Sequence, residues 1–134
     1  MEELDMRFAV RLLTTVLGLG AASAAIPESL TVNDRVFTKD QAENGEALYE
    51  VNCIACHDKK YFRPVLKAWE GQPLGVLFNV MSASMPQSNP GALPDKDYVD
   101  ILAYILSQSR YPAGDSELSV ENGALDNITI AARD

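Results

Sequence analysis

The stretch "VNCIACHDKK", residues 51–60, contains both cysteines and the single histidine of the chain. Cys53 and Cys56 are three positions apart, and His57 follows directly. Three chemistries use such a grouping: a redox-active dithiol, half of a zinc site, or the C-x-x-C-H motif that attaches haem covalently. The rest of the sequence has to decide between them.

The composition is that of an ordinary folded protein. The chain has 134 residues, of which 47% are hydrophobic and 22% are charged, and these values predict one domain. Its formal net charge of −8 argues against general nucleic-acid binding, because that function needs a basic surface to neutralise phosphates. We therefore expect no nucleic-acid partner.

Residues 1–25 have the order of a secretory signal. Arg7 and Arg11 precede an apolar run, and small residues (AASAA) close it like a cleavage site. The apolar run is shorter than the roughly 18 to 20 residues that span a bilayer, so we expect cleavage, with an uncleaved membrane anchor as the alternative. On this prediction the chain is exported, and the mature domain covers residues 26–134. Contact with a membrane would require that the leader stays attached.

Export changes what the two cysteines are expected to do, because thiols in an oxidising compartment normally form disulfides. A disulfide between Cys53 and Cys56 would close a very small loop and stabilise the fold little. A thioredoxin-like site needs a strand before the motif, but residues 39–52 have a helical pattern. A zinc site needs a second ligand cluster, which the sequence lacks. Covalent haem attachment explains the motif best, and a haem-free redox or metal-binding module is the alternative.

A haem that transfers electrons usually has a second iron ligand opposite the histidine, most often methionine or another histidine. The chain has no other histidine, so a methionine serves or the site is open. Met81 lies in the apolar helical stretch PLGVLFNVM, where we expect it to fill the core. Met85 precedes Pro86, which favours an extended loop stiffened by two further prolines. We therefore predict His57 and Met85 as the iron ligands.

The hydrophobic periodicity predicts an all-α fold. Helices are expected over residues 39–53, 65–70, 73–82 and 95–108. Asp95 or Asp97 is expected to cap the last of these helices. The segment 111–134 is rich in turn-forming residues and is expected to wrap the outside of the domain as an irregular tail.

The segments FTKDQAENGEALYEVNCIACH and ASMPQSNPGALPDKDYVDILAYIL resemble the class I cytochromes c. This resemblance implies a cytochrome c fold, with a few helices around one covalently bound haem c. It also implies that the first and last helices cross, with Gly45 allowing their close approach and Tyr49 packing near Ile101 and Tyr104. The stretch from MPQSNPG onward is most similar to single-haem cytochromes that serve periplasmic quinoprotein dehydrogenases, which implies a periplasmic location.

Two further residues are assigned through the resemblance. An iron-bound imidazole usually donates its second N–H to a carbonyl or carboxylate, and in the family a proline carbonyl after the motif accepts it. Pro64 is the matching residue. Trp69, the single tryptophan, corresponds to a residue whose indole N–H binds a haem propionate, and ordinary core packing is the alternative.

These residues favour an electron carrier over an enzyme. A Ser-His-Asp or Cys-His nucleophile needs a histidine that is not bound to iron, and a six-coordinate haem leaves no position for a substrate. The resemblance implies a redox protein as partner: a quinoprotein dehydrogenase, another dehydrogenase or a terminal oxidase. The alternative is a haem sensor or peroxidase-like protein in which Met85 dissociates from the iron.

A cluster of cations follows the motif: Lys59, Lys60, Arg63 and Lys67. Near a haem edge, such a cluster would steer an acidic partner towards the site of electron exit. Many surface clusters of this kind have no function, so an inert solvated face is the alternative.

Overall fold

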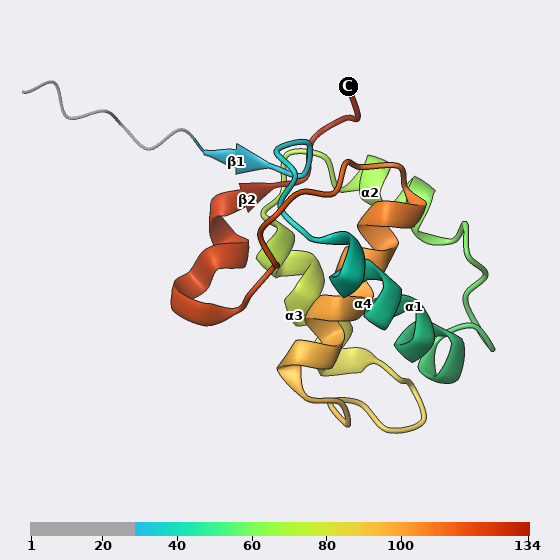
Figure 1. Cartoon of the computed structure of the whole chain (residues 1–134). Helices are drawn as coiled ribbons and strands as arrows, with labels where there is room; N and C mark the ends of the chain where they lie inside the picture. Colours follow the sequence, from blue (N-terminus) through green and yellow to red (C-terminus); the bar gives the residue numbers. More distant parts are fainter. Residues whose placement is uncertain (1–28) are drawn as a thin grey trace, which may run out of the picture.

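The computed structural model describes residues 29–134 (Figure 1), and the predicted leader lies outside the described residues. The elements are β1 (Leu30–Thr31), α1 (Lys39–Asn52), α2 (Phe62–Ala68), α3 (Leu74–Ser84), α4 (Asp95–Gln108), the 3₁₀ helix η1 (Glu121–Asn127) and β2 (Ile128–Thr129). The predicted all-α fold is confirmed, because each strand has only two residues. Within this described part of the chain, no helix combines the length and the apolar character that crossing a bilayer requires.

The helix ends follow local chemistry. The Thr38 hydroxyl accepts a hydrogen bond from the Gln41 N–H at 3.1 Å, which caps α1. α2 begins three residues before the predicted start, because Pro64 fits in the first helical turn, where its missing N–H has no helical acceptor. The predicted cap of α4 is wrong: its N-cap is Pro94 without a side-chain bond, and both predicted aspartates lie in the first turn.

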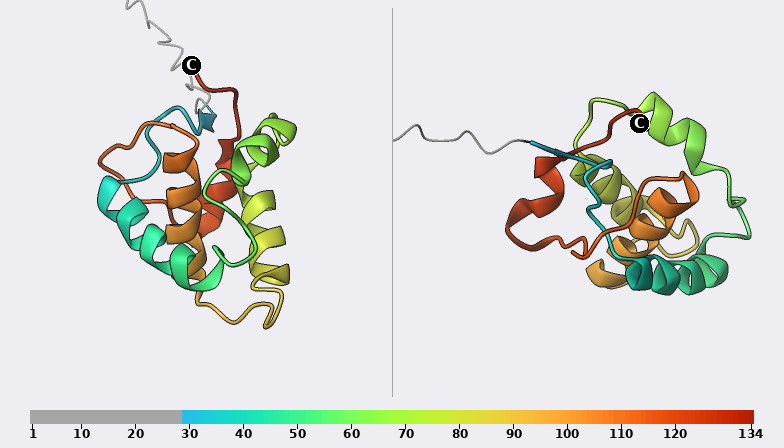
Figure 2. Two further views of the ribbon diagram at one scale, coloured as in Figure 1. Left: turned by 90° about the vertical axis from the view of Figure 1, so that its right-hand side faces the viewer. Right: turned by 45° about the horizontal axis from the view of Figure 1, so that its top comes forward.

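Helices α1 and α4 cross in direct backbone contact, and α4 lies between α1 and α3 (Figure 2). Gly45 is the contact point on α1. A Cβ at this position would lie 1.8 Å from the Asp100 carbonyl oxygen, so only glycine permits this crossing. Next to it, the rings of Tyr49 and Tyr104 pack with their centroids 5.2 Å apart. The close approach expected at Gly45 is therefore present in the structure.

The tail after α4 contributes to the core as well as wrapping it. Its buried side chains are Tyr111, Leu118, Leu125, Ile128 and Ile130. β2 near its end pairs in parallel with β1, in the register Leu30 to Ile128 and Thr31 to Thr129. The prediction of an outer wrapping is thus incomplete, because apolar residues spaced among turn formers gave no helical or strand periodicity.

A buried polar network fixes the tail to the crossing helices. The Gln41 amide donates to Asp100 Oδ1 at 3.1 Å and to the Leu118 carbonyl at 3.0 Å, and it accepts from the Leu118 N–H at 2.9 Å. Lys96 donates to both oxygens of Asp100, at 2.9 and 2.8 Å. This network gives the buried carboxylate its partners, as a charge inside a core requires.

Candidate functional site

The cysteine–histidine motif forms a tight turn at the end of α1. Cys53 is the C-cap of the helix, and its N–H donates to the Tyr49 carbonyl at 2.8 Å. The Cys53 carbonyl accepts hydrogen bonds from the N–H groups of Cys56, at 3.1 Å, and His57, at 2.9 Å. The turn therefore carries both thiols and the imidazole on one short, hydrogen-bonded segment.

The Tyr49 hydroxyl holds the chain directly after this turn. It donates to the carbonyls of His57, at 3.0 Å, and Asp58, at 3.1 Å. Burial is the main cause that raises the pKa of Tyr49 to about 12, so the hydroxyl is a hydrogen-bond donor at neutral pH. The Tyr49 ring also packs edge-on against Phe62 of α2, with 6.3 Å between centroids.

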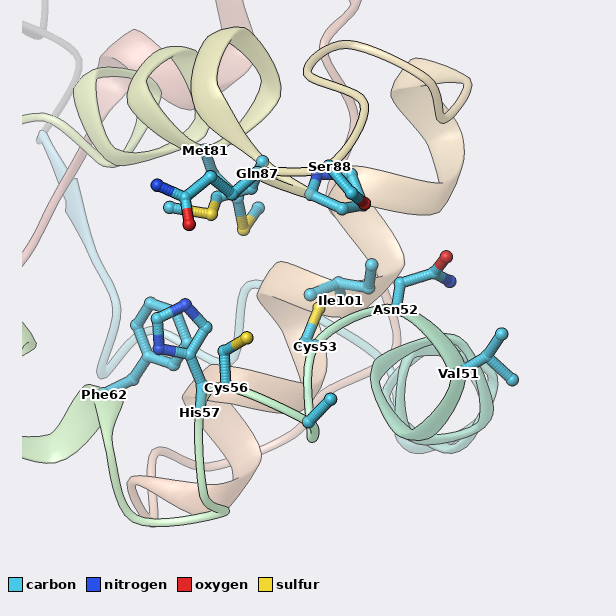
Figure 3. A pocket seen from close by; sticks show the side chains of 13 residues that line it. Val51, Asn52, Cys53, Cys56, His57, Phe62, Met81, Gln87, Ser88 and Ile101 are labelled. Atoms are coloured by element: carbon cyan, nitrogen blue, oxygen red, sulfur yellow. The ribbon is translucent and has the colours of Figure 1, made fainter.

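A cavity of about 640 Å³ opens between this turn and the end of α3 (Figure 3). Cys53, Cys56 and His57 lie on one side of it, and Met81, Gln87 and Ser88 lie on the other. The remaining lining residues are Val51, Asn52, Ala55, Phe62, Met85, Pro86 and Ile101. Its volume suits a cofactor, and its lining contains no Asp, Glu, Lys or Arg side chain.

Both methionines considered from the sequence reach this cavity. Met85 ends α3 in an extended conformation, and its carbonyl accepts a 2.5 Å hydrogen bond from the Tyr98 hydroxyl of α4. Met81 is 6% exposed, as expected for a core residue, but it also lines the cavity. Two thioethers therefore line the cavity together with the imidazole, whereas the sequence predicted only that of Met85.

The His57 ring is held by aromatic neighbours and has an unused polar atom. Its centroid lies 4.1 Å from that of Tyr61 and 5.8 Å from that of Phe62. Nδ1 is buried without a hydrogen-bond partner, so the bond to the Pro64 carbonyl expected from the resemblance is not made in the structure. Pro64 lies inside α2 on an exposed position, and a helical carbonyl there is directed along the helix axis to the N–H four residues on.

Trp69 lines a second, smaller hollow of about 280 Å³ between α2 and α3. This hollow also includes His57 and Met85, so the tryptophan belongs to the same region as the motif. The indole is half-buried and packs against the core. The structure thus brings five of the six predicted site residues to the two hollows, and Pro64 lies outside both linings.

The donor set fits covalently bound haem. Cys53 and Cys56 are free thiols, one half-buried and one exposed, and burial raises the pKa of the Cys53 thiol. Within residues 29–134 no three His, Cys, Asp or Glu side chains gather closely enough to hold a metal ion between them. His57 Nδ1 is buried without a hydrogen-bond partner, and the other ring nitrogen of this imidazole could hold a metal.

Phe62 was not predicted as part of this site, and Met81 was predicted to lie in the core alone. Phe62 begins α2 and lines both hollows, but an aromatic residue in a short charged segment carries no distinctive signal. Met81 precedes Met85 by four residues, which is the spacing of neighbours on one helix face. The sequence placed Met85 in a loop after the helix, so the shared wall is known only from the structure.

Two of the four cations after the motif make side-chain contacts within the fold. Lys59 donates to Glu46 and Glu50 of α1, at 3.1 and 3.3 Å, and these hydrogen bonds raise its pKa. Arg63 Nε donates to the Gln108 carbonyl at 3.1 Å. Steering of a partner by this cluster stays a prediction, and an inert solvated face stays its alternative.

Helices that cross at a glycine, a C-x-x-C-H turn and an apolar cavity faced by thioethers together define a c-type cytochrome with a single haem. Residues 40–105 match the family described as cytochrome c oxidase, cbb3-type, subunit III. The match supports a single-haem class I cytochrome c domain in this segment, and such a domain holds one covalently bound haem c. The comparisons with curated proteins and with solved structures give no match.

Proposed function

We propose that this protein is a periplasmic one-electron carrier whose haem is attached to Cys53 and Cys56, with His57 and Met85 as the iron ligands. The observation that carries the proposal is the 640 Å³ cavity, which has both thiols and the imidazole on one wall and Met85 among its lining residues. The bound haem supplies the ferric–ferrous couple. A carrier without substrate turnover agrees with the cytochrome c family of the chain.

The protein's own contribution is to position the ligands and to exclude water. The Tyr49 hydroxyl fixes the backbone of His57, and the Tyr61 and Phe62 rings restrict its imidazole. The Tyr98 hydroxyl fixes the backbone of Met85. A lining without charged side chains disfavours the more positive ferric state and so raises the reduction potential.

Two assignments complete the proposed site. Trp69, which lines the second hollow, is the proposed indole donor to a haem propionate. The sequence resemblance supports this role. The acceptor for His57 Nδ1 is not Pro64 in the described conformation, and binding of haem at this wall would have to bring an acceptor to that atom.

The proposed electron donor is a dehydrogenase of the quinoprotein or another type, and the proposed acceptor is a redox protein or a terminal oxidase. The order of basic, apolar and small residues in 1–25 supports export. The family description names an oxidase subunit, which supports a place near the oxidase end of an electron-transfer chain.

The test is expression of the full chain together with a cytochrome c maturation system. Mass spectrometry should show the protein plus one haem, and Cys53→Ser with Cys56→Ser should remove the adduct. A reduced-minus-oxidised spectrum should show low-spin c-type haem. An unmodified mass with free thiols would contradict the proposal, and rapid carbon monoxide binding by the reduced wild-type protein would favour the sensor or peroxidase alternative.

A further inference from the structure

The two hollows of the site meet at a junction with two thioethers. The larger hollow and the smaller one share four lining residues: His57, Phe62, Met81 and Met85. His57 and Phe62 come from the motif turn and α2, and the two methionines come from α3 and its end. The imidazole therefore faces a pair of sulfur donors and not a single one.

Met81 lies in the last turns of α3, and Met85 is the extended C-cap residue that follows the helix. The Met85 N–H donates to the Met81 carbonyl at 2.9 Å, which closes the last turn of α3. Residues four apart on a helix have Cβ atoms about 5 to 6 Å apart, and this hydrogen bond keeps Met85 in that register although its own conformation is extended. Figure 3 shows the Met81 side chain extending from α3 towards the side of the cavity that carries His57 and Cys56. The spacing is within the reach of a side chain with three rotatable bonds.

Packing alone does not require a sulfur-containing side chain at position 81, because the neighbouring core residues of α3 have none. Leu77 and Phe78 fill the adjoining core positions of α3 without a donor atom. Met81 brings a soft, neutral sulfur ligand of the type that haem iron binds in cytochromes c. It stands in an apolar wall where no charged side chain competes for the iron.

We propose that Met81 is an alternative thioether ligand, which would hold the haem iron when Met85 leaves it. In this exchange the Met85 sulfur would release the iron, and the Met81 sulfur would donate a lone pair in its place. Both thioethers are neutral, so no electron or proton is transferred. The inference rests on the proposed function, since it assumes that Met85 is the resting ligand.

The experiment compares Met85→Leu, Met85→Leu/Met81→Leu and wild-type protein, all carrying covalent haem. Leucine conserves the volume of methionine and removes only the donor atom. We expect Met85→Leu to retain the near-infrared charge-transfer band of thioether-ligated ferric haem. We expect the double variant to lose this band, and its ferrous form should bind carbon monoxide at least tenfold faster than that of Met85→Leu. Met85→Ala, alone and with Met81→Leu, repeats the comparison if leucine at position 85 prevents maturation.

The control is Met85→Leu/Val80→Leu, because Val80 is next to Met81 on α3 and carries no sulfur. It should behave like Met85→Leu alone. Loss of the band in Met85→Leu, with carbon monoxide binding as fast as in the double variant, would overturn the role of Met81. Failure of the proposed function looks different: wild-type protein would lack covalent haem, or Met85→Leu would match wild type in both band and reduction potential.

Discussion

At the scale of single residues, Tyr49 does more than fill space. A phenylalanine would satisfy the packing against Tyr104 and Phe62, but only the hydroxyl donates to the two carbonyls after the motif. The sequence resemblance suggested an aromatic contact at this position. The hydrogen bonds depend on the path of the chain after His57, which periodicity does not specify.

Tyr49→Phe is expected to lower the free energy of unfolding by about 1 to 3 kcal/mol, because two partly buried carbonyls lose their donor. Denaturant unfolding of the haem-bound protein measures this change. Tyr104→Phe is the control, since its hydroxyl makes only a 3.4 Å contact with Glu46, and it should cost clearly less. Equal losses in the two variants would show that the Tyr49 hydroxyl does not stabilise the turn.

At the scale of elements, the crossing of α1 and α4 was predictable and the helix ends were less so. Gly45 and the apolar face of the last helix pointed to a close contact, and the structure places the Gly45 position against Asp100. The start of α2 was predicted too late in the chain, because a proline such as Pro64 is compatible with both a loop and a first helical turn. The second thioether at Met81 was assigned to the core alone, since sequence spacing gives a shared face but not a cavity.

Gly45→Ala is expected to cost about 3 kcal/mol or more, at the upper end of overpacking penalties, because the added carbon meets backbone that cannot rotate away. Thermal and denaturant unfolding give the change in free energy. Ala47→Ser, at an exposed position of the same helix, should stay within about 0.5 kcal/mol of wild type. A mild effect of Gly45→Ala would mean that the helices can separate without loss.

Gln41→Leu is expected to destabilise the fold by about 2 to 4 kcal/mol, because the Leu118 N–H and carbonyl lose their partner inside the core. Asp100 would keep only Lys96. Gln72→Leu is the matched control at an exposed position and should change the free energy of unfolding little. If both variants unfold at the same denaturant concentration, the network contributes no net stability.

At the scale of the whole molecule, the tail after α4 is part of the folded unit. Four of its aliphatic side chains, Leu118, Leu125, Ile128 and Ile130, are each at most 5% exposed. Burial of such a side chain stabilises a fold by about 1.5 to 3 kcal/mol, so together they approach the entire net stability of a typical domain. Sequence inspection assigned this segment to the surface because its apolar residues follow no regular period.

Deletion of residues 117–134 is therefore expected to abolish cooperative thermal unfolding of the haem-bound protein, as followed by circular dichroism. Deletion of residues 133–134 alone removes two exposed positions and should leave the transition nearly unchanged. A cooperative transition that survives the long deletion at an unchanged midpoint would show that the tail is an appendage.

The crossing at Gly45 also constrains the order in which parts of the chain can fold. The two helices that meet there lie near opposite ends of the domain, so their contact closes a loop that contains the motif, α2, α3 and the Met85 segment. Closing such a loop costs chain entropy before any native contact between the helices forms. The C-x-x-C-H segment precedes α4 in the chain, so it is synthesised before the α1–α4 pair can form. In the folded domain Cys56 is still exposed and Cys53 half-buried, so the crossing fixes the position of the turn without closing access to the thiols.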